Sequence, residues 1–131
     1  MSYYFSADIN QDFDQAIETV TEALKDEGFG IISEIDIKDK LKEKLDVDFR
    51  RYRILGACNP SYAHKALTLE DKIGTMLPCN VIVQEKETGG AEVAAINPLE
   101  SMKAVKNPAL LEIASEVTER LQRVIDKLGS A

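Results

Sequence analysis

The chain has 131 residues and a net charge of −7, with 44% hydrophobic and 30% charged residues. This length predicts one domain over residues 1–131, large enough to bury a core of its own. The acidic balance argues against nucleic acid or an anionic membrane as a partner, because non-specific binding to either requires a basic surface.

The N-terminal part of the chain predicts a strand followed by a helix. Residues 3–9 alternate between apolar and polar side chains, which is typical of a half-buried strand. Asp12 and Gln15 resemble a capping box, and apolar residues then recur at helical spacing. Gly28 is a natural end for this helix.

Four more strands are predicted over residues 30–37, 49–58, 79–86 and 91–96. The highly charged residues 38–46 predict a short helix after the first of these strands. One or two helical turns, starting near Pro60 or Ser61, are expected before residue 79. Gly89 and Gly90 favour a hairpin between the last two strands.

A long C-terminal helix completes the pattern. Asn107 offers a capping side chain, Pro108 suits the first helical position, and an apolar stripe then continues to Leu128. The element order is strand, helix, four strands, helix. It predicts an α+β fold: an antiparallel five-stranded sheet with two long helices packed on one face.

Counting in twos assigns side chains to the two faces of this sheet. In the strand at 79–86, one face carries Cys79, Val81 and Val83, and the other Asn80, Ile82 and Gln84. In the strand at 49–58, one face carries Tyr52, Ile54, Gly56 and Cys58, and the other Arg51, Arg53, Leu55 and Ala57. We expect the more apolar set of each strand to lie under the helices. Cys58 and Cys79 then point inward, whereas Asn80 and Asn59 point away.

The face opposite the expected core raises the question of a partner. Arg51 and Arg53 lie on it, where ion pairs with Glu34 and Asp36 of the neighbouring strand would account for them. The same face is expected to carry the apolar residues Leu55, Ala57 and Ile82. This is apolar for a solvated surface, so we expect a second copy of the chain to cover it in a homodimer.

The sequence shows neither a membrane-spanning segment nor a secretory signal peptide. No run approaches the ~18 apolar residues of a membrane-spanning helix. The first residues, MSYYFSADIN, lack both a basic region and a long apolar core. We therefore expect a cytoplasmic protein with reduced thiols.

The two cysteines and the single histidine define the candidate site. In a meander the end of one strand lies beside the start of the next, so Cys58 and Cys79 should meet at one end of the sheet, with His64 near them. Two thiolates and an imidazole would suit zinc, and soft ligands also suit copper. A soft-metal site at Cys58, His64 and Cys79 is one hypothesis.

Thiol chemistry is a second hypothesis, in which the protein is an enzyme or a redox sensor. Cys58 directly precedes the helix expected near Ser61, so it is the better nucleophile, with His64 as the base. A reversible Cys58–Cys79 disulfide is a variant of it. In a third hypothesis both cysteines are small core residues and the protein is a structural or interaction module without chemistry.

The asparagines next to the cysteines allow a further interpretation. Asn59 and Asn80 suit local turns in which their amides bond nearby backbone. They could instead line a small polar pocket with His64 and Lys65 and hold a small ligand. The sequence leaves open whether the protein is an enzyme.

The same segments resemble a known family. The matching residues are Cys58-Asn59-Pro60, Ala63-His64-Lys65-Ala66-Leu67, Gly74, Leu77-Pro78-Cys79-Asn80-Val81, Asn97-Pro98 and Met102. Over nearly the whole chain they resemble the family named domain of unknown function 302; Asp71, where a proline is expected, departs from its pattern. The resemblance implies an α+β fold of the TATA-binding-protein-like type and a homodimer, and it brings no established activity.

Overall fold

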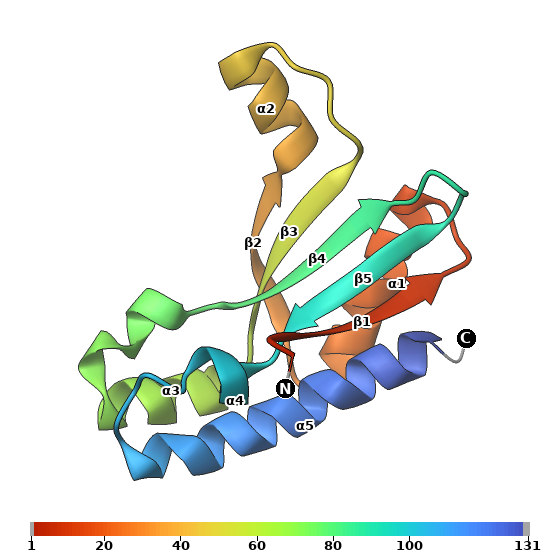
Figure 1. The fold of residues 1–131 in the computed structure, drawn as a ribbon. Helices are drawn as coiled ribbons and strands as arrows, with labels where there is room; N and C mark the ends of the chain where they lie inside the picture. The colour runs from red at the N-terminus through yellow and green to blue at the C-terminus, as the bar shows by residue number, and fades with distance from the viewer. Residues whose placement is uncertain (1, 130–131) are drawn as a thin grey trace.

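The structure is a computed structural model that describes residues 2–129. Its elements follow the predicted order (Figure 1). They are β1 (Tyr4–Ile9), α1 (Phe13–Asp26), β2 (Gly30–Asp36), α2 (Ile37–Leu45), β3 (Tyr52–Cys58), α3 (Pro60–Leu69), the 3₁₀ helix η1 (Asp71–Met76), β4 (Cys79–Glu85), β5 (Ala91–Ile96), α4 (Pro98–Ser101) and α5 (Pro108–Gly129).

The five strands form one antiparallel sheet in the order β1-β5-β4-β3-β2. Strands β2 to β5 are a meander, as predicted, and β1 pairs with the outer edge of β5. Gly89 and Gly90 turn the β4–β5 hairpin with φ values of +91° and +80°. These positive angles are easily reached by residues without a Cβ atom.

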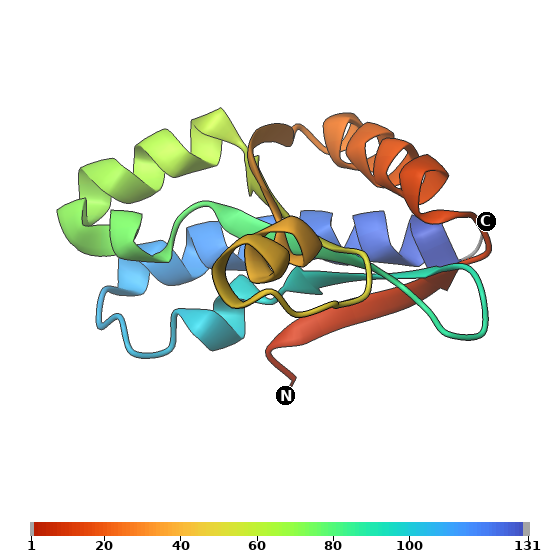
Figure 2. The same cartoon turned by 90° about the horizontal axis from the view of Figure 1, so that it is seen from above.

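Helices α1 and α5 lie on the same face of the sheet (Figure 2). The core lies between these helices and the sheet. Leu24 of α1, Leu121 of α5 and the strand residues Leu55, Val81 and Val93 are all 0% exposed in it. The predicted α+β architecture, with two long helices on one face of a five-stranded antiparallel sheet, is confirmed.

The predicted helix ends are also found. The side chain of Asp12 accepts a hydrogen bond from the backbone N–H of Gln15 at 2.8 Å at the start of α1. Gly28 follows the end of α1 with a φ of +89°. At the other long helix, the side chain of Asn107 accepts from the backbone N–H of Ala109 at 3.2 Å.

The predicted faces of β3 are wrong. Leu55 lies opposite Val81, and Ala57 lies opposite Cys79. Leu55 and Ala57 therefore share the core face with Cys79 and Val81, and they are 0% and 1% exposed. Cys58 follows Ala57 directly, so by the same alternation its position in the strand belongs to the face opposite the core.

The two arginines of this region explain the error. They lie on the helix side, with their guanidinium groups 4.4 Å (Arg51) and 5.5 Å (Arg53) from the centre of the Phe13 ring. Arg51 pairs with Asp14 at 2.7 Å, and Arg53 pairs with Asp36 at 3.5 Å across the β2–β3 ladder. Both arginines thus keep their charges paired while covering one end of the core. The predicted ion pairing of Arg53 with Asp36 is confirmed, although its face is reversed.

The segment between β3 and β4 is more helical than predicted. It forms α3 and η1 rather than one or two turns, and α4 was not anticipated because it has only 4 residues. These elements pack with the start of α5 around a second, smaller apolar cluster. Its buried members are Ala66, Ile73, Met102, Leu110 and Ala114.

The face of the sheet away from α1 and α5 is called the open face here. By strand parity its apolar side chains are Tyr4, Ile35, Tyr52, Ile54, Ile82, Ala94 and Ile96. Ile82 lies there as predicted, whereas Leu55 and Ala57 do not. Helix α2 projects beyond the sheet and has no buried residue (Figure 1).

Candidate functional site: an apolar pocket with two cysteines

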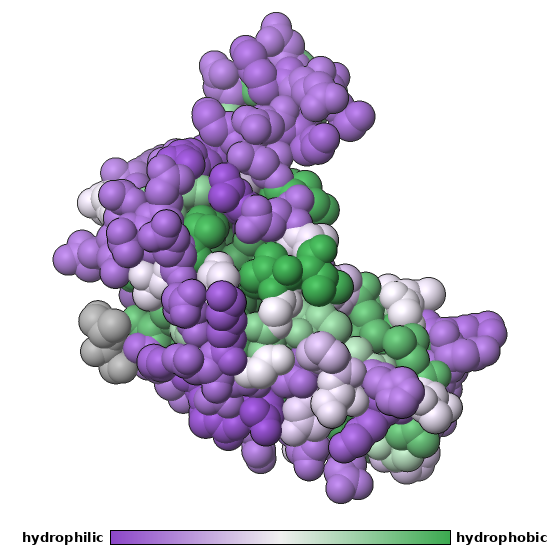
Figure 3. Space-filling model, turned by 180° about the vertical axis from the view of Figure 1, so that it is seen from behind, coloured by the Kyte–Doolittle hydropathy of each residue, from purple (hydrophilic) through white to green (hydrophobic). Residues whose placement is uncertain are grey.

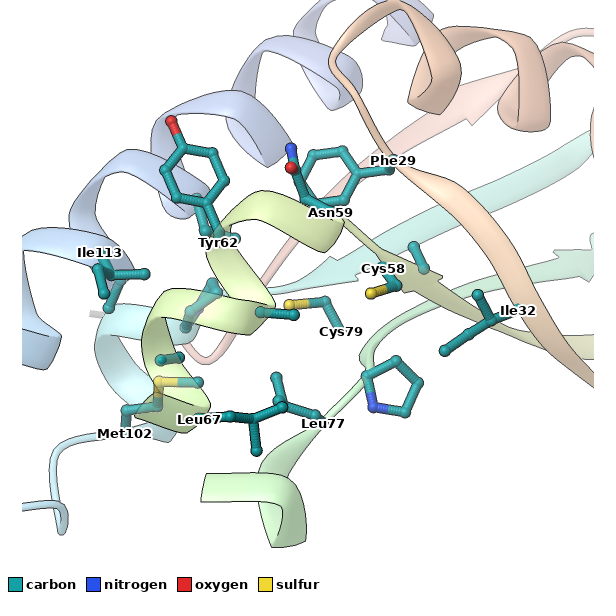
Figure 4. A pocket seen from close by; sticks show the side chains of 17 residues that line it. Phe29, Ile32, Cys58, Asn59, Tyr62, Leu67, Leu77, Cys79, Met102 and Ile113 are labelled. Atoms are coloured by element: carbon teal, nitrogen blue, oxygen red, sulfur yellow. The ribbon is translucent and has the colours of Figure 1, made fainter. Parts of the chain in front are cut away.

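A pocket of about 280 Å³ lies beneath α3, where the end of β3 and the start of β4 meet α5 (Figure 4). We call it the α3 pocket. Its walls are Phe29, Ile32, Ala57, Cys58, Asn59, Tyr62, Ala63, Ala66, Leu67, Leu77, Pro78, Cys79, Pro98, Met102, Ile113, Ala114 and Val117. It therefore joins the main core to the second apolar cluster.

Polar contacts brace one end of this pocket. Asn59 is the N-cap residue of α3, but its side chain makes no capping bond to that helix. Its Nδ2 instead donates to the backbone carbonyl of Glu27 at 3.2 Å. The same carbonyl accepts from Arg120 at 3.2 Å, and Arg120 Nε donates to the hydroxyl of Tyr62 at 3.2 Å. These bonds hold the start of α3 against the end of α1 and the middle of α5.

The pocket interior is almost wholly apolar. The polar groups that reach its edge, the Asn59 amide and the Tyr62 hydroxyl, already have partners outside the pocket. Over residues 2–129, no buried side-chain nitrogen or oxygen lacks a hydrogen-bond partner. Burying a polar group without a partner costs free energy, so this lining favours an apolar occupant.

The two thiols belong to the same wall. Cys79 lies opposite Ala57 in the β3–β4 ladder, and Cys58 is the next residue along β3. Both cysteines are free and half-buried, and Figure 4 shows them next to each other in the pocket wall. Burial, together with the neighbouring Cys58, raises the pKa of the Cys79 thiol from 9.0 to about 11. The thiolate form of Cys79 is therefore disfavoured beyond that of an ordinary thiol.

The pocket opens beside the edge strand β2. A β-bulge between Ile31 and Ser33 interrupts the β2–β3 register, and Ile32 lies at this irregularity with 64% of its surface exposed. Ile32 and the 42% exposed Leu67 both line the pocket. Figure 3 shows an apolar surface in the middle of this face with hydrophilic surface around it. Ile32 and Leu67 therefore present apolar surface where the pocket meets solvent.

The structure brings together only part of the predicted site. Cys58, Asn59 and Cys79 line the α3 pocket. His64 and Lys65 are exposed on α3 and do not line it, and the Lys65 ammonium lies 5.8 Å from the centre of the Tyr62 ring. Asn80 is exposed on the open face, away from the core, as predicted. The polar pocket predicted from Asn59, His64, Lys65 and Asn80 is not formed.

The predicted metal ligands do not converge either. Within the described part of the chain, no group of three or more His, Cys, Asp or Glu side chains is placed to hold a metal ion. Cys58 and Cys79 are neighbours, but the His64 side chain does not join them. The zinc or copper site predicted from these three residues is therefore not preformed in this structure.

The sequence prediction missed most of the apolar lining. Phe29, Ile32, Tyr62, Met102 and Ile113 come from five different segments, and none of them belongs to a recognisable motif for ligand binding. For the lining residues within 62–77, the available signal was that one or two predicted helical turns could not bury the apolar side chains of this segment. An apolar loop of this kind can indicate a second core or a pocket.

Among residues 2–129, no helix is long and apolar enough to cross a bilayer.

Comparisons with known proteins give a consistent picture. The family model described as domain of unknown function DUF302 matches residues 5–128. The crystal structure of an uncharacterized conserved DUF302 protein from Bacillus stearothermophilus is similar, with a TM-score of 0.89 and 30% identity, covering 98% of this chain and 99% of that one. An uncharacterized protein from Aquifex aeolicus (strain VF5) is 38% identical over 47 residues, which is 36% of this chain and 33% of that protein. The matched stretch thus spans about a third of this curated relative.

Proposed function

This chain belongs to the DUF302 family, a domain of unknown function, and we propose that it binds a small apolar molecule in the α3 pocket. The observation that supports this function is the lining itself: a cavity of about 280 Å³ in which the available polar side chains are bonded to partners outside it. Ligand sites are commonly concave, mostly apolar and few per protein.

The size of the pocket limits the ligand. A dry apolar cavity of ~150 Å³ holds benzene. A pocket of about 280 Å³ has room for a two-ring hydrocarbon such as naphthalene, or for a short branched chain. Lys65 and His64 lie outside the pocket, so the binding energy is expected to come from burying apolar surface rather than from an ion pair.

Naphthalene is a suitable probe for this proposal. We expect saturation-transfer NMR to detect its binding, and amide shifts in a ¹⁵N spectrum to concentrate on α3 and on the start of β4. Replacement of the half-buried pocket residue Ala63 in A63F should fill the cavity and abolish binding. The matched control is A109F, at an exposed alanine of α5 outside the pocket.

Two results would contradict the proposal. One is the absence of saturation transfer to naphthalene with the folded wild-type protein. The other is equal binding by wild type and a folded A63F protein, because the pocket that the phenylalanine fills could not then be the binding site.

We further propose that a second copy of the chain covers the open face. Helix α2 has 9 residues and none is buried, and isolated helices of fewer than ~12–15 residues are marginal in water. Its exposed Leu45 and the following Val47 are apolar, as is the open face of the same chain. In a two-fold dimer, the helix of each protomer could pack on the sheet of the other.

Light scattering tests this assembly. We expect twice the chain mass of 14.5 kDa for the wild type, and monomers for I82K, which places a charge on the open face. L111K is the control, because Leu111 is an exposed apolar residue on α5. A monomeric wild type at tens of micromolar, or a dimer that I82K leaves intact, would disprove this interface.

A further inference from the structure

We propose that Cys58 and Cys79 form a reversible dithiol–disulfide pair in the wall of the α3 pocket, oxidised by a low-molecular-weight disulfide of the glutathione type. The inference concerns a covalent modification of the protein and does not require a bound ligand. Its consequence for ligand binding, given below, rests on the proposed function.

The first support is the position of the two residues in the sheet. Ala57 and Cys79 are directly opposite each other, and Cys58 is the next residue along β3. Opposite Cα atoms of an antiparallel pair are about 5 Å apart, and one step along a strand adds about 3.3 Å, so the Cys58 and Cys79 Cα atoms are expected at about 6 Å. Disulfides commonly join Cα atoms separated by ~4.4–6.8 Å.

The second support is the direction of the side chains. Neighbouring residues of a regular strand point to opposite faces, which would separate these two thiols. Cys58 is the last residue of β3 and Cys79 is the first of β4, so each lies where its strand ends. Both side chains line the same pocket, and Figure 4 shows the two cysteines next to each other in it. The two sulfurs can therefore approach each other without breaking the ladder.

The different surroundings of the two thiols suggest the order of the steps. The raised pKa of Cys79 disfavours its thiolate, which is the attacking form, so Cys58 is assigned the first attack. The Cys58 thiolate attacks one sulfur of the glutathione disulfide, forms a mixed disulfide and displaces one glutathione thiolate. Cys79 then transfers its proton to that thiolate and attacks the Cys58 sulfur. The second glutathione leaves as a thiolate and takes up from water the proton that Cys58 had lost. Two protein thiols are oxidised, and one small disulfide is reduced to two thiols.

The pocket connects this exchange to ligand binding. A molecule that fills the pocket covers both sulfurs, since they are part of its wall. Access of the attacking disulfide, and the approach of the two sulfurs, would both be hindered. An occupied pocket should therefore oxidise more slowly than an empty one.

The test is incubation of the reduced full-length protein with oxidised glutathione, followed by acid quenching and peptide mapping without reductant. We expect a peptide pair that contains Cys58 and Cys79 joined by a disulfide and lighter by two hydrogen atoms, and its loss after treatment with dithiothreitol. C79S should stop at a stable mixed disulfide on Cys58. C58S should lose the internal disulfide and should scarcely react with glutathione disulfide.

Different results overturn the proposal. A wild-type protein that remains fully reduced, or that carries glutathione without forming the internal disulfide while still folded by circular dichroism, would disprove the pair. The effect of naphthalene is tested separately. If NMR shows that naphthalene is bound and the oxidation rate is the same with and without it, the claim that an occupied pocket slows oxidation is disproved. Failure of naphthalene to bind would count against the proposed function and would leave the mapped disulfide standing.

Discussion

The thiol of Cys79 is expected to make the folded state less stable at high pH. Its pKa is about 11 in the folded protein, against 9.0 for an ordinary thiol, because burial disfavours the thiolate and Cys58 adds to this effect. Between these two values the unfolded chain has lost the proton and the folded chain still holds it. The contribution of Cys79 to stability is therefore fully present below pH 9.0 and is lost as the pH rises through about 11.

The size of the effect follows from the shift. One pKa unit corresponds to 1.36 kcal/mol, so a rise from 9.0 to about 11 corresponds to a total loss of about 3 kcal/mol in the free energy of unfolding. About half of it should be lost near pH 10. This is a measurable fraction of the ~5–15 kcal/mol that stabilises a typical domain.

Urea unfolding of wild type and C79A, in reductant and from about pH 8 to about pH 11, isolates this residue. The variant lacks the thiol but shares the other groups that titrate in this range, so subtraction removes their contribution. We expect C79A to be less stable than wild type at pH 8, because it loses packing in the pocket wall. The gap should narrow as the pH rises. Two stability curves that stay parallel over the whole range would refute a buried, protonated Cys79.

Two further predictions address the core and the bracing of the pocket. In urea unfolding, L55A should lower the free energy of unfolding by ~2–5 kcal/mol, because Leu55 is fully buried. The control L111A, at an exposed leucine, should lower it by less than about 1 kcal/mol. Similar losses in the two variants would contradict the face assigned to β3. E27Q should cost less than about 1 kcal/mol at neutral pH, because the hydrogen bond from Arg123 lowers the pKa of Glu27 and the pair is partly solvated. This cost should disappear as the pH falls below 4.5 through the lowered pKa, and a cost that persists in acid would exclude the ion pair as its cause.

The two faces of β3 show where pattern reasoning failed. Tyr52, Ile54, Gly56 and Cys58 form a more apolar set than Arg51, Arg53, Leu55 and Ala57, and average polarity therefore selected the wrong face. The arginines lie at the beginning of the strand, where Phe13, Asp14 and Asp36 accept them on the helix side. No property of β3 by itself reveals those partners, because they come from α1 and β2. Only the register with β4 places Leu55 and Ala57 in the core.

The cysteine region shows both the success and the limit of the sequence. The meander correctly predicted that Cys58 and Cys79 would be neighbours, because β3 ends where β4 begins. The position of His64 could not be predicted in the same way, since the helical phase of α3 decides which of its residues face the pocket. That phase places Tyr62, Ala63 and Ala66 on the lining and leaves His64 and Lys65 in solvent.

The sequence by itself determined the five strands, the helix after β2 and the two long helices, because periodicity, capping residues and turn glycines act locally: Asp12 caps α1, Gly28 ends it, and Gly89 and Gly90 turn the last hairpin. It also determined the meander, since short connections join neighbouring antiparallel strands. The tertiary structure decided which face of β3 is buried and that an apolar pocket surrounds the two cysteines. Both depend on side chains contributed by distant segments, and their packing is fixed only when the helices close over the sheet.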